Sequence, residues 1–334
     1  MISGGDASPR TLGFLALTRM ELADIERTDI EQTHRTGGGD YTHVGTLLEQ
    51  ARSTLKALVE QFPKDPNWVP AYARVLTQLG DLDQKEHNLE AASQHYEAAQ
   101  TASRQAFQAA PDDAEAIRQW AWAFRKAGEL QSQRPREVVD ARQSFANDVC
   151  VMRHLVDYQP QIRRWAEDLG FSLMKLADAW MLAPADLVAA QDAYYEALLR
   201  RQRVIKSDPS KRFNYTAFAA TLKQINELHS RTDEPTLAAA FGEAYQDIQR
   251  RIPEVFPGEG TTPADSNKPR LSEAEARRER DRGVMSFVGA SRQTIEMKMQ
   301  LFADERLPLI TAGARGCWDQ IVRSATVETV AERP

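Results

Sequence analysis

Two histidines and a run of three glycines lie close together near the start of the chain, an arrangement that suggests a phosphate or metal site. His34 and His43 flank the stretch Thr36-Gly37-Gly38-Gly39-Asp40. Glycine-rich loops bind phosphate through backbone N–H groups, but a phosphate loop also has a lysine and follows a strand. This stretch has no lysine, and no strand pattern precedes it. A connector between helices is the favoured interpretation, and a ligand site is the alternative.

No other arrangement typical of catalysis is found. No serine lies in the Gly-x-Ser-x-Gly pattern of a nucleophile elbow, and neither Cys150 nor Cys317 has a recognisable catalytic setting. The two cysteines are too few and too far apart for a thiolate metal site, and the six histidines have no partner at a metal-ligand spacing. We therefore expect no enzymatic activity, no catalytic residue, no metal and no cofactor.

Cations and aromatic residues recur at related positions and suggest a binding surface. Trp122 and Phe171 each follow a small residue of a predicted helix by one position, and Arg74 has the same place in an earlier segment. A strip of this kind suits an acidic or carboxylate-ended peptide, through charge-assisted hydrogen bonds and cation–π contacts. The alternative is ordinary surface cations balanced by nearby acids. The expected peptide-binding residues are Arg74, Trp122, Arg125, Lys126, Phe171, Lys175 and Lys223.

The segments that carry these residues recur at a fixed interval. Equivalent small or polar residues close four segments, at spacings of 48, 49 and 49 residues: Gly80, Gly128, Ala177 and Asn226. A proline precedes each segment at the same spacings: Pro63, Pro111, Pro160 and Pro209. Proline breaks a helix interior but is tolerated in a connection or a first turn, so each one marks the start of a unit. A fixed period in this range predicts stacked helical units.

Each unit has the pattern of two helices. The first carries a large residue, a small one and another large one, as in Tyr72, Ala73 and Leu76, at offsets that share one helical face. The second carries an aromatic residue between alanines, as in Ala92, Tyr96 and Ala99. An aromatic side chain beside alanines suits antiparallel packing against the first helix.

This order of residues resembles the tetratricopeptide (TPR) repeat, in which a Gly-Asp turn follows a large–small pair and precedes an alanine and an aromatic residue. Here Tyr72-Ala73, Gly80-Asp81-Leu82 and Ala92 with Tyr96 fit that order. The standard TPR unit has 34 residues, so both helices are expected to be longer here. Long repeats of this kind also look like those of large bacterial signalling proteins, which implies a sensing or docking role by analogy.

The predicted fold is an all-α solenoid, a right-handed superhelix of antiparallel helix pairs with carboxyl-terminal capping helices. Proline and glycine cluster after Ile252, which predicts a linker. Helices are expected at Leu271–Arg282, Met285–Arg306 and Leu307–Val330. The predicted divisions are a repeat domain at 1–252 (units at about 10–62, 63–110, 111–159, 160–208 and 209–252), a linker at 253–269 and a helical segment at 270–334.

Composition restricts the partners. Apolar residues make up 42% and charged residues 27%, values typical of a soluble folded chain. The net charge of −6 disfavours nucleic acid as the main partner. No apolar run is long enough to span a membrane, and Met1–Thr18 lacks the pattern of a secretory leader. We expect a cytoplasmic protein without a membrane partner.

Solenoids usually bind rather than catalyse, and the leading hypothesis is therefore a non-catalytic scaffold that holds a protein or peptide in its concave groove. Trp122 and Phe171 would be the anchors, and the cations would set the polarity of the bound segment. The alternative is a regulatory or sensor module of a larger bacterial signalling assembly, whose carboxyl-terminal helices contact an effector enzyme. A catalytic role for the glycine stretch with His34 and His43 is the third hypothesis.

Overall fold

The structure is a computed structural model that describes residues 8–33, 39–63, 65–256 and 290–331. Within these ranges the regular structure is entirely helical and contains no strand, so the predicted all-α class is confirmed. The chain divides into two compact units. Unit 1 comprises Met1–Val151 with Asp319–Pro334, and unit 2 comprises Met152–Trp318. The predicted handedness of the superhelix stays a prediction.

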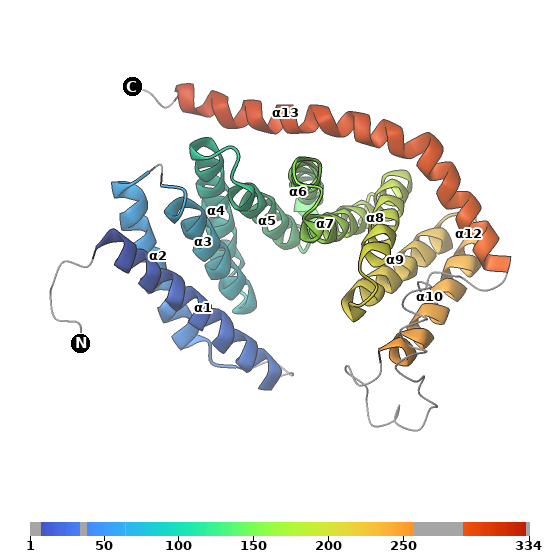
Figure 1. The fold of residues 1–334 in the computed structure, drawn as a ribbon, viewed down its shortest axis with the longest axis horizontal. Helices are drawn as coiled ribbons and strands as arrows, with labels where there is room; N and C mark the ends of the chain where they lie inside the picture. The colour runs from blue at the N-terminus through green and yellow to red at the C-terminus, as the bar shows by residue number, and fades with distance from the viewer. Residues whose placement is uncertain (1–7, 34–38, 64, 257–289, 332–334) are drawn as a thin grey trace. The chain divides into compact units, whose positions relative to one another are not determined.

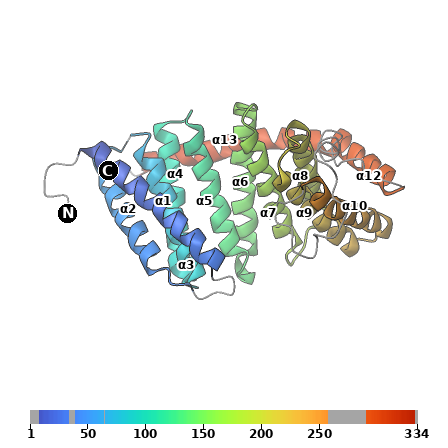
Figure 2. The same ribbon diagram turned by 60° about the horizontal axis from the view of Figure 1, so that its bottom comes forward.

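Unit 1 is built from helices that pack in the order of the sequence. Helices α1 to α5 each contact the next one along the chain, and Figures 1 and 2 show them side by side. A 3₁₀ turn, η1 (Pro135–Glu137), leads into α6 (Val138–Tyr158), which begins in this unit. The bounds are α1 (Pro9–Thr33), α2 (Thr42–Gln61), α3 (Trp68–Lys85), α4 (Leu89–Ala109) and α5 (Ala114–Gln131).

Unit 2 continues with two further helix pairs and a carboxyl-terminal addition. Helix α7 pairs with α8, α9 pairs with α10, and α12 packs on α10. A π-helical turn, η3 (Phe302–Arg306), joins α12 to α13 (Leu307–Ala331). The other bounds are α7 (Arg163–Met181), α8 (Leu187–Ser207), α9 (Arg212–Arg231), α10 (Pro235–Val255) and α12 (Ala290–Leu301).

The four prolines lie at the joints, as predicted. Helices α3, α5, α7 and α9 begin shortly after Pro63, Pro111, Pro160 and Pro209, respectively. The side chain of Asp113 caps α5 by accepting from the backbone N–H groups of Glu115 and Ala116. Helices α3 to α10 have 18 to 21 residues, so the expected long helices are also confirmed.

The carboxyl-terminal elements agree with the sequence pattern where they are described. Helix α10 includes Pro253 and ends at Val255, a little beyond the predicted start of the linker. Ile295, Met299 and Phe302 are buried, which confirms the amphipathic face predicted for this segment. The rest of the predicted linker and the predicted helix Leu271–Arg282 lie outside the described residues.

A close contact between the two helices explains the small residues of the repeat. A Cβ atom added to Gly80 on α3 would lie 2.5 Å from the ring of Tyr96 on α4. In the next helix pair, a Cβ added to Gly128 would lie 2.9 Å from the ring of Phe145. Tyr96 and Phe145 are buried, and each ring therefore fills the space that a glycine leaves open.

The hydroxyl groups of the repeat tyrosines add a polar contact to this packing. Tyr96 donates to Asp81 at 2.8 Å, and Tyr194 donates to Asp178 at 2.5 Å. Each acid directly follows the small residue of its unit. Burial raises the pKa of both tyrosines. The tyrosines remain protonated donors, so the ring and the hydroxyl together fix the second helix against the first.

The last helix pair reverses the sizes of the two residues. Asn226 on α9 stands where the earlier units have glycine or alanine, and Gly242 on α10 stands in the aromatic position. A Cβ added to Gly242 would lie 2.4 Å from Nδ2 of Asn226, which donates to the carbonyl of Ala238. The contact is again one small residue against one larger one, so the spacing of the helices is kept.

The glycine contact predicts the effect of adding one methyl group. Gly80→Ala forces the Tyr96 ring to move, and we expect a loss of about 1–3 kcal/mol in the free energy of unfolding, measured by urea denaturation. Gly316→Ala on α13 is the control, because among the described residues nothing beyond its chain neighbours and its own helical backbone lies within 4 Å of the added Cβ. The control is expected to be neutral or to gain up to about 1 kcal/mol. Equal losses in both variants would contradict the packing argument.

Candidate functional site

The predicted cations of unit 1 are engaged in ion pairs. Arg125 is 6% exposed, and its guanidinium makes two hydrogen bonds to Asp148, at 2.8 and 3.2 Å. Asp148 is fully buried and occupies a position that is alanine in two other units. An acidic residue stands at this position because Asp148 forms an ion pair with Arg125. The expectation that Arg125 belongs to a solvent-facing strip is wrong, because the pair is inside the helix packing.

Arg74 and Lys126 also contact acids. Arg74 pairs with Glu21 at 3.0 Å, and Lys126 pairs with Asp81 at 2.9 Å. The interpretation as cations balanced by nearby acids is confirmed for these two residues. Trp122 is partly buried, with the guanidinium of Arg118 at 5.0 Å from its ring centre. Its ring thus already has a cation on one side.

The predicted residues of unit 2 are more accessible. Phe171 on α7 is 39% exposed, and the Lys175 ammonium lies 5.3 Å from its ring centre. Lys223 on α9 is exposed to solvent. The predicted pairing of an aromatic residue with a cation is therefore present at Phe171 and Lys175.

Phe171 borders a small hollow between α7, α8 and α9. The hollow has a volume of about 30 Å³, enough for a group the size of a methyl or a water molecule. Phe213 stands at its edge and is 68% exposed. The lining residues are Glu167 and Phe171 from α7, Arg201 and Val204 from α8, and Phe213, Asn214 and Ala217 from α9.

Arg201 is the buried cation of this hollow. Its Nη1 donates to the carbonyl of Ala217 and, at 2.5 Å, to the hydroxyl of Thr221. Burial lowers the pKa of the Arg201 guanidinium to about 10, and the charge of Asp178 acts in the opposite direction. The group remains charged at neutral pH. Its stem passes Gly170, whose added Cβ would lie 3.4 Å from Cγ of the arginine.

Two further polar atoms of the hollow lack a hydrogen-bond partner among the residues that the structure describes. Asn214 is 4% exposed, and its buried Nδ2 has no acceptor. Oε1 of Glu167 is buried and has no donor, although Arg163 and Lys211 lie 3.8 and 3.7 Å away. Buried polar atoms are nearly always paired with protein or water. The hollow therefore offers a donor, an acceptor and a cation at one place.

The sequence contained a signal for Arg201 that was missed. Counting along the second helix from its aromatic residue, the same position is Ser103 in one unit, Met152 in the next and Arg201 in the third. In the unit that carries Arg201, the small residue of the first helix is Gly170, where Ala73 and Ala121 stand in the preceding units. The combination of a large charged residue, Arg201, with the smallest residue, Gly170, distinguishes this unit from the preceding ones.

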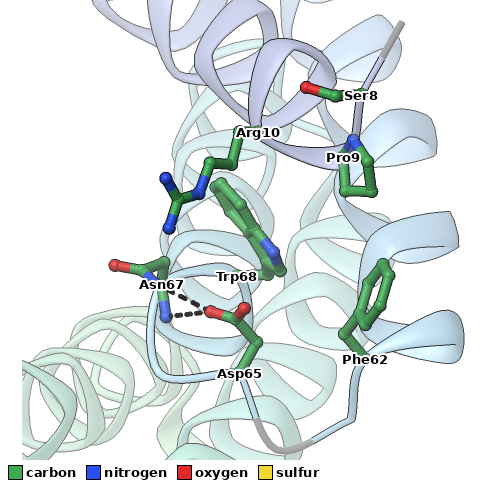
Figure 3. Close-up of a pocket in the computed structure, with 7 residues that line it drawn as sticks. All are labelled: Ser8, Pro9, Arg10, Phe62, Asp65, Asn67 and Trp68. Carbon is green, nitrogen blue, oxygen red and sulfur yellow. Dashed lines mark hydrogen bonds between the residues drawn. The ribbon is translucent and has the colours of Figure 1, made fainter. Parts of the chain in front are cut away.

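A second, larger pocket lies in unit 1, and Figure 3 shows its lining. It has a volume of about 670 Å³ and is formed by the start of α1, the end of α2 and the start of α3. Oδ1 of Asp65 accepts from the backbone N–H and the side chain of Asn67, both at 2.9 Å. These groups hold a turn together. The lining residues are Ser8, Pro9, Arg10, Phe62, Asp65, Asn67 and Trp68.

The glycine stretch with its two histidines is only partly described. His43 is exposed, and its Nδ1 lies 2.8 Å from Oε2 of Glu26. His34 and positions 36–38 lie outside the described residues. Among the residues that are described, no group of three or more His, Cys, Asp or Glu side chains is arranged to hold a metal ion. The third hypothesis stays a prediction.

A partly buried polar cluster connects α12 to the repeats of unit 2. Nε2 of His229 lies 2.7 Å from the hydroxyl of Tyr195, and its Nδ1 lies 2.8 Å from Glu234. Lys298 of α12 donates to Glu234 at 3.2 Å, and Phe302 meets Tyr195 edge to face. Tyr195 and His229 are fully buried. The cluster fastens α12 onto unit 2, which favours a cap over a free docking helix for this segment.

Comparison with protein-family models gave no match, and comparison with curated proteins gave no significant match. Among the described helices, none combines the length and the apolar composition that crossing a bilayer requires.

The His229 cluster predicts a loss of stability in mild acid. Burial lowers the pKa of His229, against the opposing effect of Glu234. Below its ordinary pKa of about 6.5, the unfolded histidine binds a proton that the folded one does not bind, so stability falls as pH falls. We expect the urea midpoint to decrease between about pH 7.5 and about pH 5.5.

The control separates the buried His229 from the partly buried His154 of the same unit. Burial also lowers the pKa of His154, so the slope is compared in His229→Gln and His154→Gln. A smaller slope in His229→Gln supports the assignment. An unchanged slope in that variant would contradict it.

Proposed function

We propose that this protein is a non-catalytic helical-repeat scaffold, TPR-like in organisation, that binds a protein or peptide segment. Phe171 carries the proposal, because its exposed ring borders a hollow in which Asn214 and Glu167 have unpartnered polar atoms. An exposed aromatic residue alone is common on protein surfaces. Where an aromatic residue lies beside hydrogen-bond donors and acceptors that have no partner, a ligand gains both apolar and polar contacts.

An extended peptide has the matching chemistry. Each of its residues offers a backbone N–H, a backbone C=O and a side chain. The N–H can donate to Glu167, the C=O can accept from Asn214, and an apolar side chain can pack on Phe171. Lys175 beside the ring adds a cation and favours an acidic segment. Binding is thus proposed to centre on unit 2, because Arg74, Arg125 and Lys126 of unit 1 are paired with acids.

The proposed setting follows from the sequence. We place the scaffold in the cytoplasm of a bacterium, in a sensing or docking role, because its repeat length looks like that of bacterial signalling proteins.

A substitution at the aromatic residue tests the proposed function. Phe171→Asp in the full chain is expected to reduce partner capture in native cells by about tenfold or more, because aromatic anchors dominate peptide binding. Capture is measured by crosslinking, affinity purification and quantitative mass spectrometry. Val188→Asp is the matched control, because Val188 on α8 is also an exposed apolar residue, at 63%.

The comparison of the two variants decides the outcome. The proposed scaffold function is supported if proteins captured by the wild type are lost in Phe171→Asp and retained in Val188→Asp. The same partner set in wild type and Phe171→Asp contradicts it.

A further inference from the structure

A pocket of about 580 Å³ lies between α8, α9 and α12, entirely within unit 2. Its volume corresponds to about 20 water molecules at liquid density, so it has room for a head group and a chain of about ten carbon atoms. Most of its lining side chains are apolar and a few are polar. Pockets of this size and lining are the usual form of small-molecule sites.

The two long walls of the pocket run in opposite directions. Arg306 at the end of η3 pairs with Asp192 near the start of α8. Phe302 at the start of η3 meets Tyr195, about one turn further along α8. Helix α12 is therefore antiparallel to α8, and its earlier residues lie opposite the later residues of α8.

The end of the pocket nearest the Phe302 contact is apolar. Leu198 of α8, Phe218 of α9 and Met299 of α12 are buried and line it. Met297 also lines the pocket, yet it is 71% exposed. An apolar chain in the pocket covers this methionine, whose flexible side chain adapts to the shape of a ligand.

The other end of the pocket carries hydrogen-bond donors on successive turns of α8. Gln202 and Lys206 follow Leu198 at four-residue spacings, so the three side chains share one face over about 12 Å. The side chains of Gln202 and Lys206 have no hydrogen bond or ion pair with another described residue. Glu296 across the pocket already has another partner. The charge that is left to be neutralised is the ammonium group of Lys206, and it selects an anion.

We propose that the pocket between α8, α9 and α12 binds the anion of a medium-chain fatty acid. One ammonium group and one amide match a monovalent head with two acceptor oxygens, and a carboxylate is such a head. It accepts from Lys206 and Gln202, and the chain runs along α8 toward Leu198 and Met299. The inference goes beyond the proposed scaffold, because it involves neither Phe171 nor the hollow beside it.

Four probes test the two ends of the ligand. The full-length protein is titrated with decanoate, decanamide, decyltrimethylammonium and hexanoate at concentrations at which each is monomeric, and binding is measured by ligand-observed NMR. Decanoate is expected to bind best. The amide and the cation are expected to bind about threefold or more weakly, because they do not neutralise Lys206. Hexanoate is expected to bind about tenfold or more weakly, because it buries four fewer methylene groups.

Matched variants locate the site. Lys206→Ala is expected to weaken decanoate binding about threefold to fivefold and to remove the preference for the acid over the amide. Arg203→Ala is the control, because it removes an exposed cation of the same helix that does not line the pocket. Leu199→Trp fills part of the pocket and is expected to abolish binding of every probe, whereas Val188→Trp, elsewhere on α8, is expected to leave it unchanged. If Leu199→Trp does not fold, Lys206→Ala still decides the question, because Lys206 is exposed.

The inference is overturned by equal binding of decanoate and decanamide, by unchanged binding in Lys206→Ala, or by no binding of decanoate. Tighter binding of decyltrimethylammonium also overturns it and assigns the pocket to a cationic amphiphile. Co-sedimentation with phosphatidylglycerol vesicles that is lost in Lys206→Ala overturns it in favour of a membrane lipid. Partner capture by Phe171→Asp is a separate measurement, so the scaffold function and the fatty-acid pocket can fail independently.

Discussion

The structure depends on a steric constraint inside each helix pair, in which one residue must be small so that a ring on the second helix can lie against the first. Gly80 with Tyr96 and Gly128 with Phe145 show this contact directly. Long helices packed side by side have many registers that bury similar apolar area. A ring that fits only opposite a small residue selects one register, and the tyrosine hydroxyl on the following acid reinforces it in two units.

This constraint also determines where functional groups can stand. Near the small residue Gly128, Arg125 is paired with Asp148 and Lys126 with Asp81. At Gly170 the space left by the missing side chain is filled by the aliphatic part of Arg201 and not by an aromatic ring. The result is a buried cation beside an exposed aromatic residue and two unpartnered polar atoms. The packing rule of the repeat and the chemistry of the hollow are therefore linked.

Much of the architecture follows from the sequence, because proline, glycine and aromatic residues act locally. The joints after Pro63, Pro111, Pro160 and Pro209 were predictable from what proline does to a helix. Side-chain pairing across helices was not, since it depends on the rotation of each helix about its axis. Arg125 and Lys126 are adjacent in sequence, yet one is buried against Asp148 and the other reaches Asp81.

In the candidate site, too, some features were predictable from the sequence and others were revealed only by the structure. Phe171 with Lys175 was predictable from helical spacing, and the structure brings the two together. Arg201 and Asn214 were not among the predicted binding residues, and only the geometry places them with Glu167 around one hollow. The reversed pair Asn226 and Gly242 was likewise hidden, because the sequence pattern weakens in the fourth unit and the two residues are recognised only by contact.

The most direct test of the account is a double-mutant cycle on that reversed pair. Gly242→Tyr alone is expected to lose several kcal/mol in the free energy of unfolding, because the new ring meets Asn226. Adding Asn226→Gly restores the order of sizes found in the earlier units and should recover about 1–3 kcal/mol, a favourable coupling measured by urea denaturation. Strictly additive losses from the two substitutions would contradict the claim that one small residue opposite one ring sets the packing of each helix pair.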